Sequence, residues 1–179
     1  FNIMVSINKD NTVEKIYQNI IKISRSKFFY IDHGLEDSFE TRFDLIIFHA
    51  FMIFYFYKND KTNKSSISQS LFDHMFEDFE SNLREMGFGD IAVNKKMKAF
   101  IRAFYGRLSQ YSKGIELVLN QDDKSLLEQA ILNNIYKGNK LYNKSIKMFV
   151  EYIIININNF QSKTEIENLN SNFEFLNFG

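Results

Sequence analysis

The longest apolar stretch of the sequence, residues 45–57, limits the folds open to this chain more than any other feature. It holds 13 residues, with His49 among them, whereas a helix needs about 20 apolar residues to span a bilayer. Apolar side chains recur from Phe39 to Phe54 with the 3.6-residue period of an α-helix, and few polar side chains interrupt them. The stretch therefore predicts a buried central helix, covered by other elements, and no transmembrane segment.

Helical periodicity also dominates the rest of the chain. It covers residues 13–21, 67–86, 97–111, 126–135 and 146–157. The alternation of a β-strand is nowhere sustained, and an apolar content of 45% excludes bulk disorder. These patterns predict an all-α fold: a single compact domain of about six or seven helices, without a sheet, over residues 1–160. We expect residues 161–179, rich in asparagine and serine, to form a C-terminal arm or tail.

The helix boundaries must be set without proline, which is absent. An Asx residue followed three positions later by glutamate is typical of a helix start, and the pairs are Asn11 with Glu14 and Asp37 with Glu40. Gly87 and Gly89 predict a helix end, Asp90 predicts the cap of the next helix, and that helix is expected to reach Gly114. Residues 58–66 carry no hydrophobic period and predict a loop, and residues 28–31 predict an ordered loop or a short helical turn.

No reaction chemistry is visible in the sequence. Cysteine is absent, which removes disulfides, thiol nucleophiles and thiolate metal sites. P-loop, nucleophile-elbow and zinc-helix motifs are also missing. Two of the three histidines are expected to be structural, His49 as a hydrogen-bonded core residue and His33 as a turn-stabilising one. We expect no catalytic residue, no metal and no cofactor.

The third histidine leaves an alternative open. His74 is surrounded in sequence by Asp73, Glu77 and Asp78, a set that a metal-dependent helical enzyme would use as ligands or as an acid–base pair. The other interpretation is an acidic, solvated helix face on which the histidine pairs locally.

Charge is distributed unevenly although its formal sum is zero. Residues 1–90 hold 10 basic and 14 acidic side chains, and residues 91–179 hold 12 and 8. Because the formal net charge is zero, no overall electrostatic field attracts the protein to DNA, so contact with any polyanion must be local. A basic cluster follows the glycine turn and consists of Lys95, Lys96, Lys98 and Arg102. It is either a face for an anionic partner, such as ribosomal RNA or lipid head groups, or one side of an antiparallel helix pair whose charges neutralise each other.

Four stretches of the sequence resemble the ubiquinol-cytochrome c chaperone family, the assembly factors of the cytochrome bc1 complex. They are SRSKFFYIDHGLEDSFETRFDLIIFHAF, SLFDHMFEDFESNLREMGFGDIAVNKKMKAFIRAFYGRLSQY, DDKSLLEQAILNNIY and FVEYIIININNF. The second stretch carries the most specific likeness, above all in residues 83–90 and 103–107. The chain departs from bacterial members at Lys27 and Glu36, where those members have proline, so the turn before the central helix is expected to be looser.

The resemblance implies an all-α, non-enzymatic chaperone that binds newly made cytochrome b and supports bc1 assembly. Mitochondrial members also act at the ribosome with a small partner protein. The location implied is the bacterial cytoplasm or the cytoplasmic face of the inner membrane, or the matrix side in an organelle, with peripheral membrane contact open.

Polar residues inside the family-like stretches are the candidates for partner binding. They are Arg42, Asp44, Asp73, Asn82, Arg84, Glu85, Asp90, Tyr105 and Arg107. The alternative role for the same residues is an internal salt-bridge network that fixes the helix pair on either side of the glycine turn.

Overall fold

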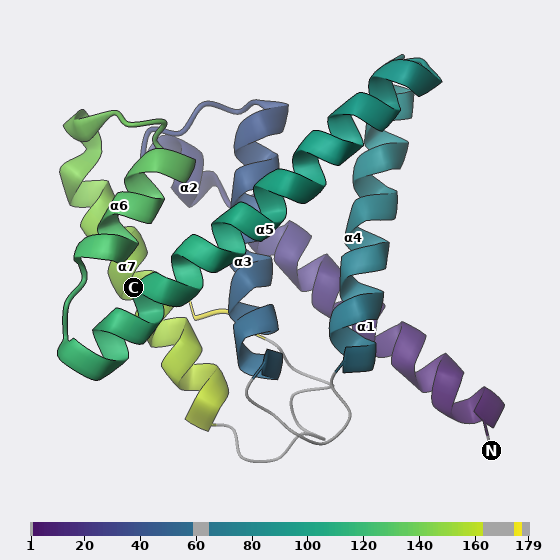
Figure 1. The fold of residues 1–179 in the computed structure, drawn as a ribbon, viewed down its shortest axis with the longest axis horizontal. Coiled ribbons are helices and arrows are strands. Elements are labelled where there is room, and N and C mark those ends of the chain that lie inside the picture. Colours follow the sequence, from purple (N-terminus) through teal and green to yellow (C-terminus); the bar gives the residue numbers. More distant parts are fainter. Residues whose placement is uncertain (1, 59–64, 163–173, 177–179) are drawn as a thin grey trace.

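The structure, a computed structural model, describes residues 2–58, 65–162 and 174–176, and these residues form an all-α fold without a strand. The helices are α1 (Asn2–Ser24), α2 (Lys27–Ile31), α3 (Phe39–Lys58), α4 (Ser65–Glu85), α5 (Asp90–Gln121), α6 (Ser125–Asn134), the short 3₁₀ helix η1 (Lys140–Tyr142) and α7 (Asn143–Ser162). Figure 1 shows the long helix α5 crossing the molecule, with α4 packed near its beginning and α6 near its end. The predicted fold class is confirmed, and α2 is the short helical turn expected at residues 28–31.

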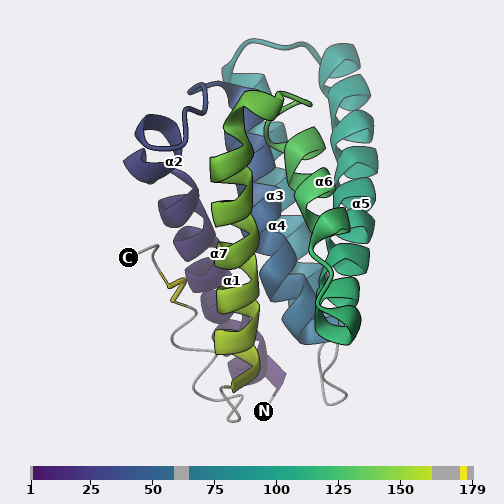
Figure 2. The same cartoon turned by 90° about the vertical axis from the view of Figure 1, so that its left-hand side faces the viewer.

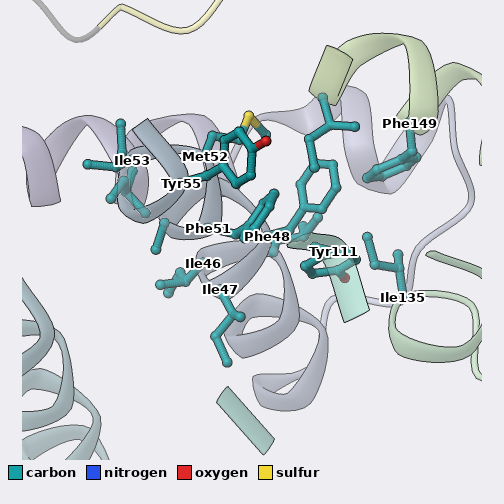
Figure 3. Close-up of a cluster of buried hydrophobic side chains, with 14 of the residues drawn as sticks. Ile46, Ile47, Phe48, Phe51, Met52, Ile53, Tyr55, Tyr111, Ile135 and Phe149 are labelled. Carbon is teal, nitrogen blue, oxygen red and sulfur yellow. The ribbon is translucent and has the colours of Figure 1, made fainter. Parts of the chain in front are cut away.

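Helix α3 is the centre of the molecule, as its sequence predicts. Thirteen of its 20 residues are buried, and α1, α4, α5 and α7 all contact it (Figure 2). Aromatic rings fill the space between these helices: the centroid of Phe48 lies 5.7 Å from that of Tyr111 and 5.4 Å from that of Phe149 (Figure 3). None of the described helices combines the length and apolar composition needed to cross a membrane.

The predicted starts of α1 and α3 are wrong. Helix α1 begins at Asn2 rather than Asn11, because residues 2–10 contain neither proline nor glycine to stop the helix from extending. At α3 the capping side chain is Ser38, whose Oγ accepts a 3.2 Å hydrogen bond from the Thr41 amide. The Asp37 carboxylate instead receives a hydrogen bond from Arg42 Nε at 2.7 Å.

The glycine turn between α4 and α5 ends α4 as predicted. Gly87 has a φ of +89°, and the Phe88 amide donates to the Leu83 carbonyl while the Gly87 amide donates to the Arg84 carbonyl, which is a Schellman motif. Asp90 does not cap α5, because Gly89 occupies the cap position without a side-chain hydrogen bond.

Helix α5 does not end near Gly114 as expected but continues to Gln121. Gly114 is buried where α5 crosses α6, and a Cβ added there would lie 2.9 Å from the Leu127 Cα. The glycine therefore permits close helix packing rather than a helix end.

The C-terminal arm is described at residues 174–176, whereas residues 163–173 and 177–179 lie outside the described part, as do residues 59–64 of the predicted loop. The ring of Phe175 lies 5.1 Å from that of His49 and 5.4 Å from that of Phe160. The Leu176 amide donates a 2.8 Å hydrogen bond to Asn156 Oδ1. This described piece of the arm is thus packed on the core.

Candidate partner-binding surface

Three of the candidate polar residues, Asp44, Arg107 and Asn82, have partners in the buried or half-buried part of the molecule. Asp44, on α3, is 2% exposed, and Arg107 Nη2 of α5 lies 2.6 Å from its Oδ1. The other carboxylate oxygen accepts a hydrogen bond from Lys137, in the segment after α6. Burial raises the pKa of Asp44, and the two cations oppose that rise. Asn82 Nδ2 donates to the Asp78 carbonyl at 2.7 Å within α4.

Lys137 is the member of this cluster that the sequence did not reveal. It has a φ of +51°, which is uncommon for a residue other than glycine. Its ammonium group also donates to the Asn134 carbonyl at 2.7 Å. No sequence signal marks either the backbone conformation or a partner 93 positions away.

Arg84 joins the two helices across the glycine turn. Its Nη2 lies 2.8 Å from Glu80 Oε1 on α4, and its Nη1 lies 2.6 Å from Asp90 Oδ1 at the start of α5. Arg84 and Asp90 are exposed and Glu80 is half-exposed, so these ion pairs contribute little to stability. Arg84 and Asp90 are therefore ion-paired with each other across the turn.

Two further candidates have partners close in sequence. The Arg42 guanidinium makes two hydrogen bonds to the Asp37 carboxylate, at 2.7 and 2.9 Å. Asp73 accepts a 2.8 Å hydrogen bond from Gln69 Nε2 one turn earlier on α4. The pairing with Arg42 lowers the pKa of Asp37.

Tyr105 and most of the basic cluster lie on the solvent side of α5, and Glu85 is the last residue of α4. We call this surface the α5 outer face and define it by Ile91, Lys95, Lys98, Arg102 and Tyr105, which alternate at spacings of four and three. All five side chains are exposed. The structure assigns Lys95, Lys98 and Arg102 no ion pair with any residue that it describes, whereas Lys96 Nζ lies 4.7 Å from the centroid of the Phe88 ring. Mutual neutralisation of the two helices thus applies to Arg84 and Asp90 but not to the α5 outer face.

Exposed apolar side chains mark both ends of this face. Ile91 is 89% exposed and Tyr105 is 58% exposed, and Met86, in the adjoining turn, is 56% exposed. The helix rise of 1.5 Å per residue places Ile91 and Tyr105 about 21 Å apart along the axis. Glu85, exposed beside Met86, is the acidic candidate at this end. The α5 outer face thus has exposed apolar side chains at its ends and exposed cations between them.

The metal alternative is not supported by the geometry around His74. Its Nε2 faces Glu14 of α1, 2.9 Å away, and its ring meets the edge of Tyr17 at 5.0 Å. Asp78 is engaged elsewhere, because the Tyr17 hydroxyl donates to its Oδ2 at 2.6 Å. In the described part of the chain, no three histidine or carboxylate side chains converge closely enough to hold a metal ion.

The other two histidines belong to the core. His49 is fully buried, and its Nδ1 lies 2.7 Å from the Leu45 carbonyl. Burial lowers its pKa to about 3, which keeps the imidazole neutral. His33 is also buried, its ring lies 4.4 Å from that of Phe28, and its carbonyl accepts a hydrogen bond from the Tyr136 hydroxyl at 3.1 Å. The expected core role of His49 is confirmed, and His33 lies deeper than a turn residue.

Comparison with known proteins shows a match to one protein family and a similar fold in one crystal structure. A family model described as ubiquinol-cytochrome C chaperone matches residues 32–174. The crystal structure of the Cbp3 homolog from Brucella abortus superposes with a TM-score of 0.83 at 23% sequence identity, covering 97% of this chain and 93% of that one. No curated protein sequence matches the chain. The structural likeness, at this identity, establishes a shared fold.

Proposed function

The chain belongs to the ubiquinol-cytochrome c chaperone family, and from that premise we propose that it is a non-enzymatic chaperone that binds newly made cytochrome b and supports assembly of the cytochrome bc1 complex. The family match spans the central helix, the glycine turn and all of the candidate residues. The fold shared with the Cbp3 homolog is consistent with this role.

The α5 outer face is the observation that carries the proposal. Most candidate polar residues are occupied by intramolecular partners, whereas Lys95, Lys98 and Arg102 have no ion pair within the described residues. Exposed apolar anchors with cations between them suit a protein segment that is partly apolar, as an unassembled membrane subunit is. A chaperone needs such a face to hold its client, and a helical one presents it along a single helix.

The test is capture of cytochrome b by the tagged protein from a native host in mild detergent, with cytochrome b quantified by mass spectrometry. Lys98→Glu with Arg102→Glu reverses two charges on the face, and Lys140→Glu with Lys144→Glu makes the same change at exposed sites elsewhere. Arg84 and Arg107 are unsuitable targets because both are ion-paired internally. We expect the first variant to lose about tenfold in capture and the control to retain it. Wild-type capture no greater than that of unrelated membrane subunits would contradict the proposal.

The same three cations favour a second candidate, contact with ribosomal RNA, alone or with a small partner protein. Binding through phosphates weakens steeply with salt, by about one power of the salt concentration per neutralised phosphate. Sedimentation with ribosomes that falls as salt is raised, and that is lost with Lys98→Gln and Arg102→Gln, would support this candidate. Association that is absent or indifferent to salt would exclude it.

We place this activity in the bacterial cytoplasm or at the cytoplasmic face of the inner membrane, or on the matrix side in an organelle. Peripheral membrane contact is part of the proposal because the client is a membrane subunit. Fractionation of cells before and after a salt wash tests it, and recovery only in the salt-resistant membrane fraction that detergent releases would contradict it.

A further inference from the structure

Two hollows lie at the end of the bundle where α1 finishes, beside α2 and the start of α3. Figure 2 shows how these three helices are arranged there. The outer hollow has a volume of about 410 Å³ and is lined by Arg25, Lys27, Tyr30, Ile31, Asp37 and Arg42. The inner one has a volume of about 60 Å³. Arg25 and Arg42 line both, so the two hollows are adjacent, and we call the pair the composite pocket and the outer hollow its mouth.

The mouth of the composite pocket has an excess of positive charge. Its one carboxylate, Asp37, is already held by Arg42 through two hydrogen bonds. Asp78, at the inner hollow, accepts a hydrogen bond from Tyr17. Arg25 and Lys27 are exposed, and the structure assigns neither an ion pair with a described residue. A guanidinium and an ammonium at one mouth are suited to an oxyanion.

The inner hollow is more apolar than the mouth. Half of its ten lining residues are apolar side chains from α1, α3 and α4, namely Ile21, Phe39, Phe43, Ile46 and Phe79. Its volume of about 60 Å³ is well below the roughly 150 Å³ of a cavity that accepts benzene. It therefore has room for a short aliphatic group but not for an aromatic ring.

We propose that the composite pocket binds the C-terminal end of a peptide, with the carboxylate held by Arg25 and Lys27 and a short aliphatic side chain in the inner hollow. The charged mouth and the more apolar inner hollow beside it define the chemistry, a carboxylate next to an aliphatic group. The choice of a peptide over a small organic acid rests on the proposed chaperone function. The pocket is separate from the α5 outer face, since no residue of that face lines it.

Ligand analogues test the two compartments without disturbing the fold. In NMR titrations of the full chain, N-acetyl-L-leucine has both required groups, N-acetyl-L-leucinamide lacks the charge, and acetate lacks the aliphatic side chain. We expect N-acetyl-L-leucine to shift the amide signals of residues 25–31 and 37–43 and to bind about tenfold more tightly than either analogue or inorganic phosphate. Equal binding of all four, or shifts elsewhere only, would overturn the proposal.

Variants test the residues. Arg25→Gln with Lys27→Gln should weaken N-acetyl-L-leucine about tenfold, while Lys15→Gln with Lys22→Gln, the same charge change at exposed α1 residues that do not line the pocket, should not. Asp37→Asn should tighten binding several-fold, because it releases Arg42 from its present partner. Unchanged affinity in the first variant, or weaker binding after Asp37→Asn in a protein that still folds, would overturn the assignment.

The source of the carboxylate is decided by peptide length. N-acetyl-Gly-Gly-Leu with a free C-terminus should bind at least as tightly as N-acetyl-L-leucine, and its C-terminal amide should not bind. If only the single amino acid binds, the occupant is a small acid and the peptide assignment is wrong. These titrations use purified protein alone, so their failure is distinguishable from a failure to capture cytochrome b.

Discussion

Arg107 Nη2 lies 2.6 Å from Asp44 Oδ1, and this ion pair connects α5 to the centre of the molecule. The Arg107 side chain is 16% exposed and that of Asp44 2%. Both residues belong to the family-like stretches, yet their side chains face each other inside the molecule and not another protein. A buried charge that loses its partner is costly because water cannot reach it, so the pair, with Lys137, holds α3, α5 and the end of α6 in one arrangement.

Replacement of Arg107 should therefore destabilise the protein. We expect Arg107→Gln to reduce the free energy of unfolding by about 3 kcal/mol, since it leaves the Asp44 carboxylate buried beside Lys137 alone. Arg102→Gln, an exposed site on the same helix, should change it by less than about 0.5 kcal/mol. Urea denaturation followed by circular dichroism measures both. Equal effects of the two variants would show that the ion pair is not structural.

The protein should become less stable as the pH is lowered, because of His49. Burial lowers the pKa of this side chain to about 3, whereas an unfolded chain keeps a value near 6.5. Between these values the unfolded state binds more protons, so the free energy of unfolding rises with pH and is lost as pH falls. From about pH 6.5 to about pH 5 the expected loss is about 2 kcal/mol.

The control for this pH dependence is His49→Gln, which keeps a polar side chain near Tyr152 but does not titrate. Its stability is lower at neutral pH, and its slope between pH 5 and pH 6.5 should be much smaller than that of the wild type. A residual slope of the same sign is expected from His33, whose pKa burial also lowers. An unchanged slope in His49→Gln would assign the effect to other groups.

Two glycines of α5 should respond oppositely to the same substitution. A Cβ on Gly114 would lie 2.9 Å from the Leu127 backbone, whereas a Cβ on Gly106 has no atom within 4 Å. Gly114→Ala should therefore destabilise by about 2 kcal/mol through overpacking against α6. Gly106→Ala should stabilise by up to about 1 kcal/mol because alanine favours the helix. Thermal unfolding distinguishes them, and a shift of the same sign in both would contradict the close packing of α5 on α6.

Hydrophobic periodicity was sufficient to predict the helices and their central member. Helix α3 is buried because its apolar side chains extend around most of the helix. A helix with a solvated face has an apolar stripe on one side only. Helix ends were predicted less well, because the Asp37 and Asp90 side chains act as ion-pair partners of Arg42 and Arg84 instead of as caps. A tertiary partner outweighs a local capping preference of similar size.

The candidate residues divide in a way that sequence alone does not reveal. Composition cannot say whether a cation in a helix faces a carboxylate of the same molecule or solvent. Arg107 and Arg102 lie five positions apart on α5, yet one contacts Asp44 and the other lies on the α5 outer face. The helix rotation that separates them becomes visible only once the neighbours of α5 are known.

The apolar ends of the α5 outer face provide the most direct test of the proposed function. Ile91 is 89% exposed, so Ile91→Ser should change the free energy of unfolding by less than about 0.5 kcal/mol. If Ile91 is an anchor for cytochrome b, the same variant combined with Met86→Ser should reduce capture about tenfold, because apolar anchors contribute most of the energy of a protein interface. Leu141→Ser is the matched control, since Leu141 is 91% exposed and lies outside this face. Capture that falls equally in the control would indicate a general effect of surface polarity, whereas capture retained in both would place the client elsewhere on the molecule.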